Sequence, residues 1–64
     1  MNRLNNKCRI HTKVSGQVSV LWYANAKSTA SHDVASIADA ITWARDNGFV
    51  QYALEAEVGK WHTL

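Results

Sequence analysis

Cys8 and His11 have the two-residue spacing that is found in zinc sites. His32 and His62 are further ligands of the right type. However, residues three positions apart on a strand point to opposite faces, and the chain has only one cysteine. We therefore expect no metal site and no cofactor, and we interpret Cys8 as a buried thiol and His11 as an exposed imidazole.

Other side chains with catalytic potential are Ser31, His32, Asp33, Glu55 and Glu57. The first three are the residue types of a hydrolase triad, but consecutive residues cannot aim at one another as nucleophile, base and orienting acid. The two glutamates share one face of a predicted strand, with no cleft that would make either a general acid. The three glycines form no phosphate-binding loop. We expect a protein that is not an enzyme.

The length and composition predict one small folded domain. The chain has 64 residues, of which 47% are hydrophobic and 19% are charged. No apolar run approaches the roughly 20 residues that cross a bilayer, and the start has no apolar signal segment. A lone cysteine fits a reducing compartment. We expect a cytoplasmic domain over residues 1–64, with residues 1–6 as a flexible tail and no membrane partner.

Charge is divided unevenly along the chain. Residues 1–32 carry five basic residues and no acidic one, whereas residues 33–64 carry two basic and five acidic residues. This division predicts either ion pairs between the two halves or two surfaces of opposite sign.

Two alternating segments, residues 8–14 and 17–24, predict a hairpin. A two-residue turn would place the basic side chains of the first strand on the apolar face. A three-residue turn over residues 15–17 brings both apolar faces together, and we adopt this register. Its pairs are Val14 with Val18, Thr12 with Val20, Ile10 with Trp22, and Cys8 with Ala24.

Residues 25–32 are small and polar and predict a loop. Apolar residues then recur at helical spacing up to the Asn47-Gly48 pair, which is expected to end the helix. Either Ser31 or Asp33 is placed to cap its first turn. The predicted inward stripe consists of Val34, Ile37, Ala38, Ile41 and Ala44, which leaves Trp43 toward the outer edge.

Residues 49–58 alternate again and predict a third strand. The expected fold is α+β with ββαβ order, in which the helix covers one face of a mostly antiparallel, three-stranded sheet. A crossover through the helix makes the last strand parallel to the second. We favour strand order 2-1-3, with 1-2-3 as the alternative. Trp61 is expected to close one end of the core.

The face of this sheet opposite the helix is expected to be mixed. Basic side chains of the first strand share it with Glu55 and Glu57, so cross-strand ion pairs are favoured over a phosphate track. Tyr23 lies opposite Arg9 in the adopted register, which predicts a cation–π contact. The aromatic and charged side chains together resemble an interface, with candidate partner-binding residues Arg9, His11, Lys13, Leu21, Tyr23 and Trp43. The alternative is a small nucleic-acid-binding or regulatory protein that uses Arg3, Lys7, Arg9 and Lys13.

In size, element order and lack of catalytic side chains, the chain resembles the small accessory proteins of phages and prophages, including anti-CRISPR inhibitors. The resemblance implies a non-enzymatic module in the host cytoplasm that occupies a surface of a host protein or nucleoprotein complex. DNA-mimicking inhibitors are strongly acidic, whereas this chain has a pI near 9.0. We therefore expect a protein partner, and a homodimer is a further expectation for so short a chain.

Overall fold

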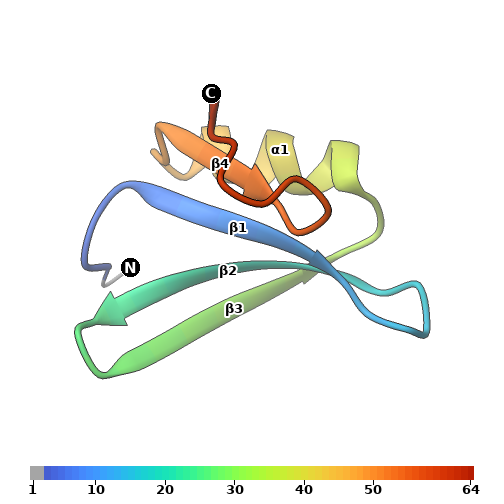
Figure 1. Ribbon diagram of the computed structural model, residues 1–64, viewed down its shortest axis with the longest axis horizontal. Helices are drawn as coiled ribbons and strands as arrows, with labels where there is room; N and C mark the ends of the chain where they lie inside the picture. The colour runs from blue at the N-terminus through green and yellow to red at the C-terminus, as the bar shows by residue number, and fades with distance from the viewer. Residues whose placement is uncertain (1–2) are drawn as a thin grey trace.

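A computed structural model describes residues 3–64 of the chain. These residues form one helix and five strands in the order βββαββ, with the helix on one side of the sheet (Figure 1). The strands are β1 (Lys7–Thr12), β2 (Val18–Asn25), β3 (Ser28–Val34), β4 (Gln51–Leu54) and β5 (His62–Thr63), and the helix is α1 (Ile37–Asp46). The fold is α+β, as predicted, but the sheet has two more strands than expected.

The strands join one mixed sheet in the order β3-β2-β1-β4-β5. β4 lies beside β1, which is the neighbour that the predicted order 2-1-3 gives it. The two strands are parallel, whereas the sequence predicts that the last strand runs parallel to the second. The additional strand β3 explains the difference, because it reverses the chain before α1 and so reverses the direction of β4.

The predicted loop over residues 25–32 is wrong, since most of it belongs to β3. This strand pairs with β2 in antiparallel register, from Val18 opposite Val34 to Asn25 opposite Ser28. Most of its side chains are exposed, because β3 is an edge strand that packs little against the core. The segment therefore lacks the apolar alternation by which a strand is recognised.

The hairpin of β1 and β2 keeps the predicted faces but not the predicted register. Thr12 pairs with Val18 rather than with Val20, a shift of two residues. The longer turn is closed by hydrogen bonds from the Gly16 N–H to the Lys13 carbonyl, at 2.9 Å, and from the Lys13 N–H to the Gln17 carbonyl, at 2.8 Å. A shift of two leaves every side chain on its face. The buried apolar members are Cys8, Ile10, Val18, Val20 and Trp22.

The helix begins later than predicted. The hydroxyl of Ser36 accepts a hydrogen bond from the Asp39 N–H at 3.1 Å, so Ser36 is the N-cap, and neither Ser31 nor Asp33 caps the helix. The C-terminal end is as predicted. Asn47 caps it, and Gly48 has a φ of 84°, a conformation that favours glycine.

α1 packs on the sheet through Ala40 and Ala44, which are fully buried. The side of the helix that faces the sheet is therefore rotated relative to the predicted apolar stripe. Ile37, which was predicted to face inward, is 42% exposed. Two small side chains let the helix backbone approach the sheet closely, and larger side chains fill the flanks. Trp43 is one of them.

The prediction for Trp43 at the outer edge of the helix is also corrected. Its ring lies 5.5 Å from that of Trp22 and 6.2 Å from that of Phe49, measured between centroids. His32 stacks on it at 4.3 Å with an interplanar angle of 9°. Trp43 is thus half-buried at the rim of the core, between α1 and β3.

The predicted third strand, residues 49–58, ends early. β4 stops at Leu54, and the N–H of Glu57 donates to the Leu54 carbonyl at 3.0 Å, which turns the chain back. Val58 is 94% exposed in this turn. The return allows β5 to pair with β4, where Tyr52 lies opposite His62.

Residues 3–6, expected as part of a flexible tail, are hydrogen-bonded to the domain, whereas residues 1–2 lie outside the described residues. The Leu4 N–H donates to the Tyr23 carbonyl at 2.7 Å, and the Asn6 carbonyl accepts from the Val50 N–H at 2.8 Å. No helix within residues 3–64 has the length and apolar character needed to span a membrane.

Candidate functional site

The face of the sheet turned away from α1, called the outer face below, is built from rows of side chains that cross the strands. In the first row, Tyr23 pairs with Thr29, and Lys7 pairs with Gln51. The second row consists of Ser31, Leu21, Arg9 and Ala53. The third consists of Asp33, Ser19 and His11. Successive rows are two residues apart along each strand, so all three present their side chains on the same side.

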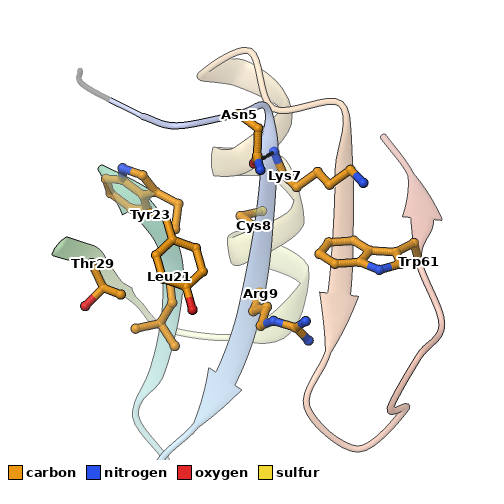
Figure 2. Close-up of a pocket in the computed structure, with 9 residues that line it drawn as sticks. Asn5, Lys7, Cys8, Arg9, Leu21, Tyr23, Thr29 and Trp61 are labelled. Carbon is orange, nitrogen blue, oxygen red and sulfur yellow. Dashed lines mark hydrogen bonds between the residues drawn. The ribbon is translucent and has the colours of Figure 1, made fainter. Parts of the chain in front are cut away.

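A pocket of about 430 Å³ lies over the first two rows. Figure 2 shows Leu21 and Tyr23 on one flank, Trp61 on the other, and the side chains of Lys7 and Arg9 extending from β1 toward Trp61. Asn5 and Thr29 also line it. We call Lys7, Arg9, Tyr23 and Trp61 the basic-aromatic site.

Trp61 lies on this face. The prediction that it closes one end of the core is therefore wrong. Trp61 immediately precedes β5, and Leu64 immediately follows it. Because side chains alternate along this segment, Leu64 points toward the core and Trp61 toward the outer face. There Trp61 lies beside the buried Ala53 of β4. Its indole is 37% exposed. The Lys7 Nζ lies 5.3 Å and the Arg9 Cζ 5.1 Å from its ring centroid, so both cations interact with one ring.

Lys7 and Arg9 form no ion pair with any carboxylate of the described chain. The third row of the outer face differs, because its side chains contact carboxylates. We call Asp33, Ser19, His11 and Glu55 the paired row. His11 Nδ1 lies 2.6 Å from the Glu55 carboxylate, and the Ser19 hydroxyl donates to Asp33 at 2.6 Å.

Asp33 in the paired row also faces Lys13, whose Nζ lies 3.8 Å from the carboxylate. The hydrogen bond from Ser19 holds the pKa of Asp33 below its usual value, and the Lys13 charge lowers this pKa further. The carboxylate of Asp33 is therefore the stable form at neutral pH.

Glu57 does not share the outer face with the basic strand, which corrects the expectation for it. It lies in the turn after β4, where its carboxylate is 3.0 Å from His62 Nε2 and 3.5 Å from Lys60 Nζ. The His62 hydrogen bond lowers the pKa of Glu57, against the effect of desolvation, and Lys60 adds to the lowering. This acidic side chain is thus satisfied locally and contributes little to the field over the pocket.

The structure brings together only some of the predicted partner-binding residues. Arg9, Leu21 and Tyr23 line the pocket. His11 belongs to the paired row, Lys13 pairs with Asp33, and Trp43 lies on the helix side of the sheet.

The predicted contact between Tyr23 and Arg9 is absent from the described residues, because the shifted register places Leu21 opposite Arg9. Arg9 instead covers the Trp61 ring.

Of the predicted nucleic-acid residues, Lys7 and Arg9 share the pocket, whereas Arg3 lies elsewhere. Its guanidinium donates to the Asn47 carbonyl at 2.7 Å and covers the Phe49 ring at 4.5 Å. Asn5, Thr29 and Trp61 also line the pocket, and their place there is not predicted from the sequence. Residues 61–64 have no apolar alternation, so the sequence carries no signal for the face of Trp61, which depends on the strand that β5 joins.

Cys8 is unsuited to nucleophilic chemistry in this structure. It is 2% exposed, and burial raises the pKa of its thiol to about 11, although the Arg3 charge opposes the shift. The neutral thiol therefore dominates at physiological pH. His11 lies on the opposite face of the sheet, and no three His, Cys, Asp or Glu residues within residues 3–64 are grouped as metal ligands.

The Ser31-His32-Asp33 segment is part of β3, so its side chains alternate between faces. Ser31 and Asp33 belong to rows of the outer face, whereas His32 stacks on Trp43 on the helix side. The three side chains therefore cannot act together on one substrate.

Comparisons of the chain with models of known protein families, with curated proteins and with solved structures found no match.

Proposed function

We propose that this protein is a non-enzymatic nucleic-acid-binding protein that uses the outer face of its sheet. The observation that carries the proposal is the pair Lys7 and Arg9. These neighbouring cations line a pocket, have no carboxylate partner among the described residues, and lie beside aromatic rings. Basic side chains that are not neutralised attract phosphates, and aromatic rings stack on bases.

The position of the acidic residues supports this choice over the protein-binding function that the sequence favours. That preference depends on glutamates beside the basic strand cancelling its charge. Glu57 instead pairs with His62 and Lys60, and Glu55 pairs with His11. Glu55 lines a neighbouring pocket together with Arg9, but within residues 3–64 neither carboxylate forms an ion pair with Lys7 or Arg9. The two cations therefore keep their charge available to a phosphate.

Fluorescence anisotropy with labelled RNA and DNA oligonucleotides tests the proposal. We expect binding at low salt that weakens as the salt concentration rises from about 50 to 200 mM, because each phosphate contact releases counterions. K7Q/R9Q removes two phosphate contacts and should reduce the slope of log K against log salt by about 1.4. No binding of either nucleic acid at low salt would overturn the function.

The matched control is K13Q/K60Q. This variant has the same change in net charge, but both lysines are paired with carboxylates, Asp33 and Glu57 respectively. It should retain most of the affinity. An equal loss in both double variants would show that only net charge matters and would contradict a specific site.

A second candidate function is the inhibitor-type protein-binding module that the sequence analysis favours. The supporting observation is a neighbouring pocket of about 280 Å³ on the outer face, lined by Leu21, Leu54 and Val58 together with charged side chains. An apolar centre with a charged rim is typical of protein interfaces.

Size-exclusion chromatography with light scattering separates the two functions and also measures the expected homodimer. A host protein that co-elutes with the wild-type chain and with K7Q/R9Q, but not with L21E, would favour the protein-binding function. A complex with nucleic acid alone, lost in K7Q/R9Q, would contradict it.

A further inference from the structure

We infer, on the basis of the proposed function, that the basic-aromatic site takes unpaired nucleotides rather than a duplex. One base stacks on Tyr23 and another on Trp61, and the phosphates between them contact Lys7 and Arg9. The bound segment crosses the strands, with the paired row along one side of its path.

The spacing of the rings supports two separate stacking positions. Tyr23 is on β2, and Trp61 immediately precedes β5, with β1 and β4 between them. Three strand-to-strand steps separate the backbones of the two residues by roughly 14 Å, and the Trp61 ring reaches back toward Lys7 and Arg9. Lys7 and Arg9 project from β1, inside this interval (Figure 2). A chain that stacks at both ends therefore passes its backbone over the two cations.

Tyr23 and Trp61 can stack only on bases that are free of the stacking within a nucleic-acid duplex. Tyr23 is 54% exposed, and Trp61 is 37% exposed. In a duplex each base face is covered by its neighbours, whereas an unpaired base can leave the stack and cover a protein ring. The ring of Trp61 already carries two cations, so a phosphate that draws Lys7 or Arg9 outward exposes more of the indole to a base.

The paired row confines the bound segment on one side. Asp33 and Glu55 place two carboxylates at the end of the outer face beyond Arg9, and phosphates approaching them are repelled. The favourable surface therefore covers two rows of side chains. We expect a footprint on the order of four nucleotides, at the short end of the range for single-strand-binding domains.

A length series of unlabelled oligothymidylates, in competition with a labelled single strand, tests the footprint. Affinity should rise steeply up to about four nucleotides and then only slowly. A matched hairpin duplex should compete far less well. Equal competition by the duplex, or an affinity that keeps rising steeply with length, would overturn the inference.

Ring variants test the stacking directly. Y23L and W61L keep apolar bulk but remove the ring, and each should weaken binding by about 5- to 150-fold, whereas Y23F and W61F should bind nearly as the wild type. Tyr23 is exposed and on a well-paired strand, so Y23L remains informative if W61L fails to fold.

Oligonucleotides with abasic positions separate this inference from the proposed function. For an abasic strand, Y23L should bind as the wild type does, because no base is present to stack, while K7Q/R9Q should still weaken binding. If abasic and intact strands bind equally and Y23L has no effect on either, the stacking inference fails and the phosphate-binding function stands. If no strand binds, both fail.

Discussion

The basic-aromatic site and the paired row lie on the same face of the same sheet, yet their charges have different environments. Lys7, Arg9 and His11 alternate along one strand, β1, and point to the same side. His11 meets a carboxylate at 2.6 Å. Lys7 and Arg9 meet the Trp61 ring instead.

The difference shows that the neighbouring strands determine which groups a β1 side chain contacts. β2 contributes Ser19 next to His11 but Leu21 next to Arg9. At the end of β4 the chain supplies Glu55 to the third row, whereas the second row receives Ala53. Two positions along a strand are enough to change a surface that carries carboxylates into one that carries cations without a carboxylate partner in the described chain.

The largest effect is expected from reversing the charge of the basic-aromatic site. K7E/R9E should reduce affinity for single strands by more than about a hundredfold, because each charge-assisted contact is worth about 1.5 kcal/mol or more and repulsion is added. Anisotropy measures this loss. As a folding control, the buried Cys8 thiol should react as slowly with a thiol reagent in the variant as in the wild type, since burial raises its pKa to about 11. Retained affinity would contradict the comparison.

A smaller effect of opposite sign is expected from neutralising the paired row. D33N/E55Q releases Lys13 and His11 from their carboxylates. Affinity should increase severalfold, and one new phosphate contact by Lys13 would increase the magnitude of the salt slope by about 0.7. Isothermal titration calorimetry in a salt series measures both. If affinity falls, the paired row contributes to binding, and the boundary that we assign to it is wrong.

The next effect is on stability as the pH falls. The folded pKa values of Asp33 and Glu57 are lowered, so their contributions to stability are present above the ordinary pKa values of 3.8 and 4.5 and are lost as the pH falls through the lower folded values. Urea unfolding of the wild type should show this loss. D33N/E57Q should have a flatter profile in the same pH window, and an equally steep profile would contradict the assignment.

The smallest expected effect is a change in the pKa of one side chain, Asp33. S19A removes the hydrogen bond that is the main cause of the low pKa of Asp33. The pKa of Asp33 should rise toward its ordinary value, and the Lys13 charge should keep it from reaching that value. Carboxyl NMR titration measures the change. T12S, a substitution on the neighbouring strand β1 at a position opposite Val18, should leave it unchanged.

Much of the fold could be predicted from the sequence because alternation and helical spacing are local properties. The faces of β1 and β2 were predicted correctly even though their register was shifted, since a shift of two preserves the alternation. β3 could not be predicted in this way, because an exposed edge strand has no apolar face to reveal it. The end of β4 at Leu54 could not either, since alternation continues through the turn to Val58.

The candidate site was predicted only in part. Arg9, Leu21 and Tyr23 were assigned to the outer face from alternation, and all three line its pocket. Trp61 was not, because its face depends on the pairing of β5 with β4.

The sequence alone determined a small α+β domain, the buried and outer faces of β1 and β2, and the end of the helix at Asn47-Gly48. These features depend on side-chain periodicity and on backbone preferences, which act over a few residues. Only the tertiary structure decided the neighbours across strands. By adding β3 and β5 to the edges of the sheet, it placed Trp61 beside Lys7 and Arg9 and directed Glu57 to His62. Such contacts join distant segments, whose relative positions depend on the packing of the whole domain.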